Sequence, residues 1–180
     1  MTGPGADVRR SKWLSLVLRH HPERAGIVLD EAGWADVEAV LAGARASGVP
    51  LSREELLRVV AESPKRRFAL DGTGTRVRAV QGHSVPVALG LATARPPELL
   101  WHGTHAAALD AIRREGLRPM GRHHVHLSAD PEAAARVGAR RGRPVVLEVA
   151  AGRMHARGLP FWRAENGVWL CDAVPPDCLR

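Results

Sequence analysis

The sequence contains few cysteines and lacks a long hydrophobic run. Its two cysteines, Cys171 and Cys178, cannot by themselves form a disulfide framework or a zinc site. We therefore expect both to be small buried hydrophobes in a reducing compartment. No apolar run approaches the roughly 20 residues that span a bilayer, and residues 1–7 lack the cationic and apolar blocks of a signal peptide. These absences predict a soluble, cytoplasmic protein.

Lysine is also scarce, although the chain is basic. Of 26 basic residues only Lys12 and Lys65 are lysines, and the net charge is +7 with a pI near 11.0. A basic chain favours a polyanionic partner such as nucleic acid. However, coding bias alone can produce an arginine-rich chain that is also rich in Ala, Gly and Pro. The charge is spread evenly, +3 over residues 1–80 and +4 over the remainder, so charge is a weak argument by itself.

The first 80 residues predict three helices and a hairpin. An apolar stripe predicts a helix over residues 7–20, with Asp7 as its N-cap, that ends at Arg19-His20-His21 before Pro22. A short strand is expected over residues 26–29 and a turn over 30–34. Further signals are an Asp36 cap, a capping box over 52–55 and a hairpin over 67–80. This α+β pattern predicts a winged-helix-like lobe over residues 1–80.

Residues 81–97 are rich in Gly and Pro and are predicted to link the two lobes. The second lobe, residues 98–180, is expected to combine short strands with small helices. Strands are predicted at 99–101, 124–128, 144–149, 161–164 and 168–172, and helices at 106–115, ending at Gly116, and from Asp130-Pro131-Glu132 toward Val137.

The stretch 122–128, Arg-His-His-Val-His-Leu-Ser, places one cation and three imidazoles within seven residues. Val125 and Leu127 alternate with His124 and His126, which is strand periodicity. One face of the strand should therefore be apolar and the other should carry both rings. A surface strand and an opportunistic metal patch remain open as alternatives.

Seven such blocks occur in order along the chain. They are Leu18-Arg19-His20, Leu29-Asp30-Glu31 with Gly33-Trp34, Lys65-Arg66-Arg67-Phe68, Gln81-Gly82-His83-Ser84, Leu100-Trp101-His102-Gly103-Thr104, Arg122 to Ser128, and Glu165-Asn166-Gly167-Val168-Trp169-Leu170. Each is weak alone, but together they make the sequence resemble the KptA-type RNA 2′-phosphotransferases nearly from end to end. Trp101, where relatives are expected to have Tyr, is a mild departure.

The resemblance implies an N-terminal winged-helix-like lobe that faces RNA and a C-terminal lobe with the ADP-ribosyltransferase fold. It implies a catalytic quartet, Arg19, His20, Arg67 and Arg122, and an NAD site that includes His102, His126 and Val168. We add Gly103, Thr104 and Ser128 to the expected cofactor contacts, and Gln81, His83 and Ser84 to the expected substrate contacts. Helix capping is the alternative for Thr104 and Ser128, and a polar interlobe linker is the alternative for Gln81, His83 and Ser84.

The implied reaction consumes NAD and needs no metal. The internal 2′-phosphate of the RNA displaces nicotinamide, giving 2′-phospho-ADP-ribosylated RNA. Attack by the adjacent ribose hydroxyl then releases 2′-OH RNA and ADP-ribose 1″,2″-cyclic phosphate. A phosphate is already anionic at neutral pH, so this chemistry requires arginine forks to align it and an imidazole to move protons.

Three other functions remain open. A non-catalytic winged-helix nucleic-acid binder would use Arg76 and Arg78 on the hairpin. An ADP-ribosyltransferase could stop after the first step and modify a phosphorylated nucleic-acid end or a protein. A metal enzyme could use His124 and His126, although no carboxylate or Cys partner stands at ligand spacing. We expect a monomer that acts on RNA, in RNA ligation or repair or in removing unusual phosphates.

Overall fold

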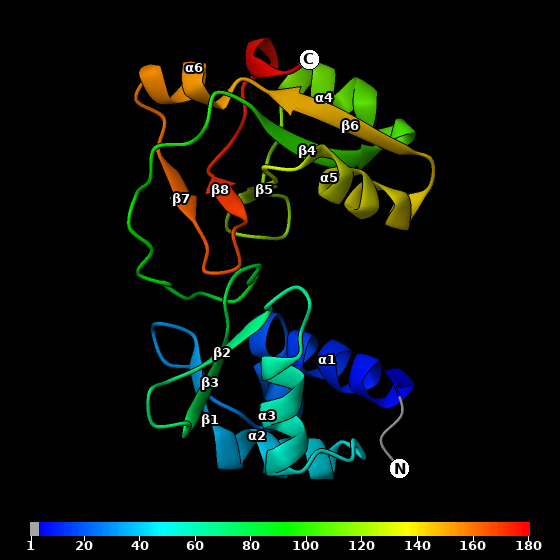
Figure 1. Cartoon of the computed structure of the whole chain (residues 1–180), viewed down its shortest axis with the longest axis vertical. Helices are drawn as coiled ribbons and strands as arrows, with labels where there is room; N and C mark the ends of the chain where they lie inside the picture. The colour runs from blue at the N-terminus through cyan, green and yellow to red at the C-terminus, as the bar shows by residue number, and fades with distance from the viewer. Residues whose placement is uncertain (1–3) are drawn as a thin grey trace. The chain divides into compact units, whose positions relative to one another are not determined.

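A computed structural model describes residues 4–180, which divide into two compact units, one extending to Gly90 and the other covering Leu91–Arg180. Both units combine helices with small sheets, and every strand pair is antiparallel (Figure 1). The predicted mixture of helices and short strands is therefore confirmed. Each unit has a hydrophobic core of its own.

The α-helices of the first unit are α1 (Pro4–Arg19), α2 (Val37–Ala46) and α3 (Arg53–Ala61). The caps predicted for α2 and α3 are confirmed. The Asp36 side chain accepts from Ala39 N at 2.9 Å, and Ser52 with Glu55 forms the reciprocal capping box. The predicted N-cap at Asp7 is wrong, because α1 begins earlier and its first turn contains Asp7, whose carboxylate accepts from Arg10 and Arg58.

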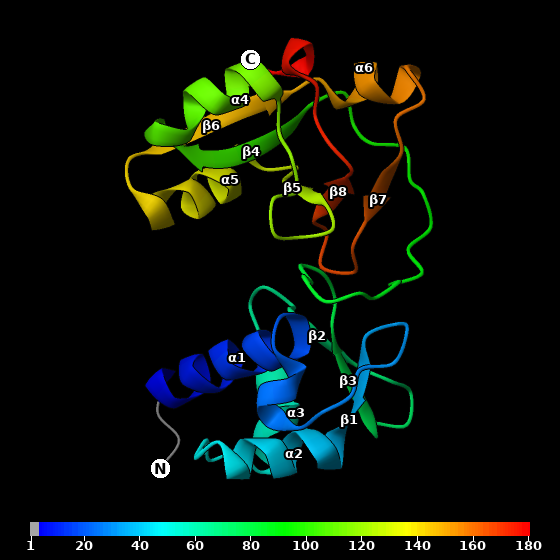
Figure 2. The same cartoon turned by 180° about the vertical axis from the view of Figure 1, so that it is seen from behind.

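The sheet of the first unit has the strand order β1-β3-β2 (Figure 2). Its strands are β1 (Trp34–Asp36), β2 (Phe68–Leu70) and β3 (Arg76–Ala79), and the β2–β3 hairpin was predicted. The strand predicted over residues 26–29 is wrong. The 3₁₀ helix η1 (Pro22–Ala25) instead leads into Gly26 at φ 61°, and Ile27 N bonds Pro22 O at 3.2 Å. Ile27 is buried beside the helices, so its apolar side chain needs no strand partner.

The core of the first unit forms where the apolar faces of α1, α2 and α3 meet the sheet. Its fully buried members include Leu14, Val17, Leu18, Val37, Val40, Leu56 and Val77. Arg10 lies at the edge of this core and is only 4% exposed. Its guanidinium donates to Pro50 O at 2.8 Å and pairs with Asp7 and Glu55. Burial of this cation is tolerated because the Nε, Nη1 and Nη2 groups of Arg10 each donate to an oxygen, and two of these oxygens belong to carboxylates.

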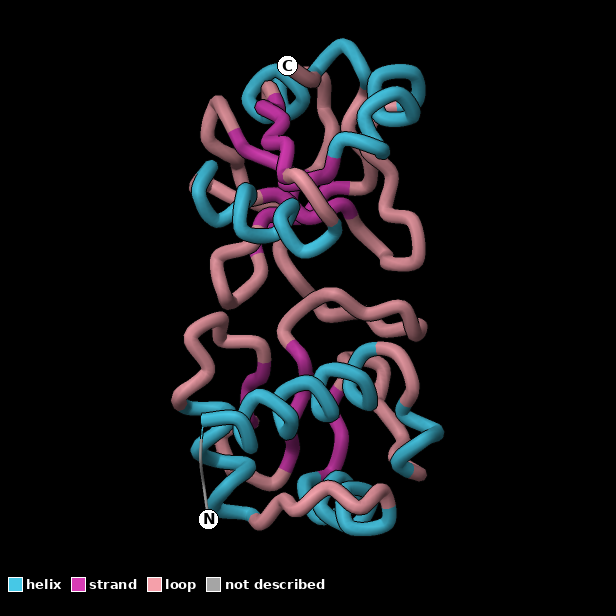
Figure 3. The backbone as a smooth tube through the Cα atoms, turned by 90° about the vertical axis from the view of Figure 1, so that its right-hand side faces the viewer, coloured by secondary structure: helices cyan, strands magenta, loops and turns pink. Residues whose placement is uncertain are grey.

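The second unit contains two sheets, with the strand orders β4-β6 and β5-β8-β7. Figure 3 draws the strands in magenta. Its elements are β4 (Leu100–His105), η2 (Ala106–Ala108), α4 (Leu109–Glu115), β5 (Val125–Leu127), α5 (Pro131–Gly138), η3 (Ala139–Arg141), β6 (Pro144–Val149), α6 (Ala151–Ala156), β7 (Phe161–Arg163), β8 (Trp169–Cys171) and η4 (Pro176–Cys178). The five predicted strands are confirmed, but β4 extends beyond its predicted end at Trp101 and continues to His105. Helix α6 was not predicted, because six residues are too short for a periodic signal.

Helix α5 packs closely on β4 through two glycines (Figure 1). A Cβ atom on Gly103 would overlap the carbonyl oxygen of Ala134, and one on Gly138 would overlap the carbonyl oxygen of Thr104. Glycine is required at both positions because the backbones of helix and strand approach each other too closely for a side chain. Alternation along β4 then directs His102 and Thr104 to the face opposite α5.

The segment over residues 81–97 forms backbone bonds with both units. Ser84 N donates to Arg19 O at 2.9 Å and Ala88 N to Glu31 O at 2.7 Å, both within the first unit. Ala94 N donates to Phe161 O at 2.8 Å within the second. The division after Gly90 therefore falls inside this segment.

Both cysteines are buried and free, as predicted. Burial, assisted by the nearby Asp172 charge, raises the pKa of the Cys171 thiol to about 12, and burial also raises the pKa of Cys178. Neither thiol is therefore ionised at neutral pH. Over residues 4–180, the helices are all too short or too polar to span a membrane.

Candidate active site

Arg19 and His20 lie at the C-terminal end of α1, and the segment after β3 folds back onto them. His20 Nδ1 lies 2.9 Å from Ser84 Oγ. Arg19 O accepts from Ser84 N at 2.9 Å and from Val85 N at 3.3 Å. The last carbonyls of a helix have no partner within the helix, so this segment satisfies one of them and holds Ser84 beside the His20 ring.

Arg67 lies at the open end of the β2–β3 hairpin. Its carbonyl oxygen accepts from Val80 N at 3.0 Å, and its own N–H donates to Ser63 Oγ at 3.5 Å. Residues 80–84 therefore connect the backbone of Arg67 to that of Arg19. The first unit thus brings three members of the predicted quartet, Arg19, His20 and Arg67, to the two ends of one five-residue stretch.

That stretch contains the three predicted substrate contacts, and their environments differ. His83 is only 2% exposed. Its Nε2 lies within 3.4 Å of the position that a Cβ on Gly33 would take, so the ring packs against the turn before β1. Gln81 is half-buried, and Ser84 is exposed. A structural role is thus visible for His83, whereas Ser84 is tied to His20.

In the second unit, His102 on β4 and His126 on β5 are joined by a hydrogen bond. His102 Nδ1 lies 3.0 Å from the carbonyl oxygen of His126. A carbonyl can only accept, so Nδ1 carries the proton. The pKa of His102 is lowered, first by burial and further by the Arg122 charge, although the bond to His126 opposes this shift. His102 is therefore neutral at pH 7, and its Nε2 is a hydrogen-bond acceptor.

Arg122, the fourth member of the predicted quartet, lies in the turn that leads through His123 and His124 into β5. Its N–H donates to Pro119 O at 3.2 Å and closes a turn in which Met120 has φ 57°. Its charge acts on His102, so its guanidinium is within electrostatic range of that imidazole. The second unit therefore brings Arg122, His102 and His126 into one neighbourhood.

The alternation predicted for the histidine-rich stretch is confirmed. Val125 and Leu127 are buried, 3% and 2% exposed, whereas His124 and His126 are half-buried. Val125 and Leu127 belong to the core, so the imidazoles occupy the opposite face of the sheet.

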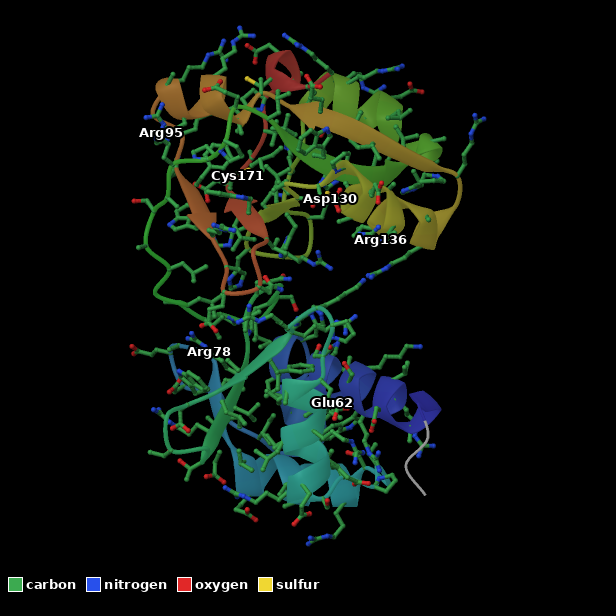
Figure 4. The ribbon with its side chains drawn as sticks, in the orientation of Figure 1. Glu62, Arg78, Arg95, Asp130, Arg136 and Cys171 are labelled. Carbon is green, nitrogen blue, oxygen red and sulfur yellow. The ribbon has the colours of Figure 1, made fainter. Side chains whose placement is uncertain are left out.

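The structure separates the capping alternatives for the two hydroxyl residues. Thr104 lies inside β4 and is buried, and the residue at the N-cap of η2 is His105, so the capping interpretation is wrong for Thr104. Ser128 Oγ accepts from Asp130 N at 3.1 Å, so it supports the start of α5. Asp130 caps that helix and also pairs with Arg136 at 3.5 Å (Figure 4).

Gly103 and Val168 are placed by local packing. A side chain at position 103 would point into α5, so close packing against this helix is enough to require glycine there, and no ligand is needed to explain it. Val168 is half-buried just before β8, and its N–H donates to Asn166 Oδ1 at 3.4 Å across a turn that Gly167 closes at φ 82°.

One neighbour of the site was missed from the sequence. Trp162 on β7 lies beside His124, with ring centroids 5.0 Å apart. The register aligns Trp162 with Leu170 and Leu170 with His126, so these side chains share a sheet face. Only the pairing of β5, β8 and β7 reveals this relationship, and no local motif could have found it. Over residues 4–180, no cluster of three or more His, Cys, Asp or Glu side chains could hold a metal ion.

Arginine and histidine thus gather at the end of α1 in the first unit and around β4 and β5 in the second. Guanidinium forks beside imidazoles are typical of enzymes that handle phosphate groups. Residues 5–173 match the model of the RNA 2′-phosphotransferase, Tpt1 / KptA family. The chain belongs to this family, and it is a transferase that acts on RNA 2′-phosphates.

Curated relatives agree with this family over almost their whole length. A probable RNA 2′-phosphotransferase of Streptomyces coelicolor is 57% identical, covering 96% of this chain and 94% of the relative. The probable enzyme of Agrobacterium fabrum is 58% identical over 92% and 89% of the two chains. The RNA 2′-phosphotransferase of Escherichia coli K12 is 52% identical over 94% and 93%.

Proposed function

We propose that the protein removes an internal 2′-phosphate from RNA in an NAD-dependent reaction, with Arg19, His20, Arg67 and Arg122 as its catalytic residues. We further propose that the first unit is a winged-helix-like RNA-binding lobe and the second an ADP-ribosyltransferase fold. The order of three helices and a hairpin in one, and the two small sheets in the other, support these assignments.

The observation that carries the proposal is the bond between His102 and His126. It makes His102 a neutral acceptor at Nε2, and such an acceptor suits a ribose hydroxyl, which donates, and not a phosphate oxygen, which also accepts. The chemistry of the site therefore fits the sugar of a dinucleotide. When bound, NAD would supply an ADP-ribosyl electrophile with nicotinamide as the leaving group.

In the first step the protein has to hold a nucleophile that is already ionised. The RNA 2′-phosphate needs no general base, so arginine forks suffice to bind and align it. By the resemblance described above, Val168 stands where many protein-modifying relatives have a catalytic Glu, so an apolar residue there agrees with a nucleophile that needs no base. Arg19 and Arg67 in the first unit and Arg122 in the second are the cations assigned to this task.

The second step requires proton transfer. The RNA 2′-oxygen leaves phosphorus while a ribose hydroxyl attacks, and a group titrating near neutrality serves both events. His20 is the imidazole assigned to this step. The arginines would stabilise charge on the phosphoryl oxygens. Each such contact typically lowers the activation free energy by several kcal/mol.

The decisive experiment uses a short RNA with one internal 2′-phosphate, incubated with and without NAD while every product is identified. We expect 2′-OH RNA, ADP-ribose 1″,2″-cyclic phosphate and free nicotinamide, with NAD only. RNA or protein that retains ADP-ribose would favour an ADP-ribosyltransferase that stops early. Absence of nicotinamide release would favour a non-catalytic nucleic-acid binder.

A further inference from the structure

We propose that Ser84 is a positioning residue that fixes the tautomer and orientation of His20, and not a substrate contact. This inference rests on the proposed catalytic role of His20. Two segments that are far apart in the chain meet here: the end of α1 supplies the carbonyl of Arg19 and the ring of His20, and the segment after β3 supplies Ser84.

The backbone geometry fixes where Ser84 stands. Its N–H donates to Arg19 O at 2.9 Å, and Val85 N donates to the same oxygen at 3.3 Å. Arg19 is the last residue of α1, and its carbonyl lies at the negative end of the helix dipole. The two N–H groups therefore anchor the segment at a place that attracts donors, independently of the Ser84 side chain.

The side chain adds a directed chain of hydrogen bonds. Ser84 Oγ lies 2.9 Å from His20 Nδ1 and makes a longer contact of 3.5 Å to Arg19 O. A hydroxyl has one proton, and a carbonyl can only accept. Both contacts are satisfied together only when Oγ–H donates to Arg19 O and His20 Nδ1–H donates to Oγ.

This arrangement assigns the roles of the two ring nitrogens. In neutral His20 the proton resides on Nδ1, so Nε2 has a lone pair and can accept a proton from an attacking ribose hydroxyl. The imidazolium that results has Nε2–H and can protonate the departing RNA oxygen. Ser84 thus prepares His20 to act first as base and then as acid, as a buried carbonyl does for other catalytic imidazoles.

The test compares Ser84→Ala with Ser84→Thr, which keeps the hydroxyl. Ser52→Ala is the matched control, because it removes the cap of α3 in the same unit without touching His20. The ring nitrogens of His20 are observed by ¹⁵N-edited NMR at a pH where the ring is neutral. We expect a protonated Nδ1 in the unmodified protein, in Ser84→Thr and in Ser52→Ala, and a shift toward protonated Nε2 in Ser84→Ala.

Turnover of the 2′-phosphorylated RNA is measured on the same proteins. We expect kcat to fall about ten-fold in Ser84→Ala, as for other residues that orient a working imidazole, with KM for RNA changed less than about two-fold because a positioning residue does not bind substrate. Ser84→Thr should recover most of kcat. A raised KM with unchanged kcat would make Ser84 a substrate contact and overturn the proposal.

The NMR measurement needs no RNA, so it separates this inference from the proposed function. A neutral His20 protonated at Nε2 in the unmodified protein overturns the tautomer assignment whatever the enzyme does. Conversely, a protein that shows the expected tautomer but does not dephosphorylate RNA contradicts the proposed function and leaves the role of Ser84 as a structural one.

Discussion

His102 Nδ1 donates to the carbonyl oxygen of His126 at 3.0 Å, so a side chain on β4 is fixed by the backbone of β5. Beside this bond, Ser128 N donates to Trp101 O and Trp101 N donates to Ser128 O, each at 2.8 Å. The two sheets of the second unit are therefore joined at Trp101 and Ser128, next to the two histidines that we propose contact NAD. The ring of His102 is neutral and oriented before any ligand binds.

The pKa of His102 predicts a pH dependence of stability. Burial, reinforced by Arg122, lowers its pKa in the folded protein, while in the unfolded chain the imidazole titrates near about 6.5. As pH falls through that value the unfolded chain takes up the proton first, so the free energy of unfolding should decrease. The decrease should stop once pH lies below the folded pKa.

Urea unfolding between pH 7.5 and 5 measures this effect. The pKa of His124 is also lowered, mainly by burial, so the comparison that isolates His102 is with His102→Gln. This variant should lose less stability on acidification than the unmodified protein. Equal slopes for the two proteins would contradict the neutral, buried state of His102.

Arg122→Ala should reduce dephosphorylation by about a hundred-fold to a thousand-fold, because loss of one electrostatic contact to a phosphoryl transition state typically has this effect. The exposed helix residue Arg114 on α4 offers the matched control. Arg114→Ala removes the same charge and should leave turnover within about two-fold. Circular dichroism checks that both variants are folded, and near-normal turnover in Arg122→Ala would remove it from the catalytic quartet.

RNA affinity should weaken linearly with the logarithm of salt concentration, because binding releases counterions from the phosphates. Each phosphate contact on a single strand adds about 0.7 to the slope. Arg122→Ala should lower the slope by about this amount. Fluorescence anisotropy of a labelled oligonucleotide measures the affinity at salt concentrations from roughly 50 to 300 mM, which bracket the physiological ionic strength. A flat response in the unmodified protein would contradict binding through phosphates.

Gly103→Ala should destabilise the second unit by about 2–3 kcal/mol, because its Cβ would overlap the carbonyl of Ala134 and push α5 from β4. Gly72 has no heavy atom within 4 Å of its Cβ position and lies in the turn between β2 and β3. Gly72→Ala should therefore change stability by less than about 0.5 kcal/mol. Thermal unfolding compares the two, and equal melting temperatures would contradict the packing role of Gly103.

Arg10→Ala should destabilise the first unit by roughly 3 kcal/mol, since it leaves Glu55, Asp7 and the Pro50 carbonyl without a buried cation. Arg53 pairs with Glu38 at 2.8 Å on the surface, where both side chains are exposed. Arg53→Ala should cost less than about 1 kcal/mol. Chemical denaturation decides between them, and a similar small loss in both would mean that the Arg10 network contributes little.

Local signals in the sequence determined the starts of α2, α3 and α5 and the position of the hairpin. Asp36, Ser52 with Glu55, and Asp130 act within one turn of the chain, so their capping roles follow from spacing alone. The alternation of Val125 and Leu127 with His124 and His126 was likewise predictable, because strand periodicity needs no knowledge of the partner strand. The family was recognisable from ordered motifs.

Tertiary structure decided what depends on partners distant in the chain. Residues 26–29 look like a strand but form none, because a strand is defined by its hydrogen-bonded neighbour and the sheet of the first unit takes Trp34–Asp36 instead. The requirement for glycine at position 103 comes from α5, the contact of Ser84 with His20 spans 64 residues, and the tautomer of His102 is set by a carbonyl 24 residues away. Sequence selects the residue types and the local turns, whereas long-range packing decides which atoms meet and therefore which protons they carry.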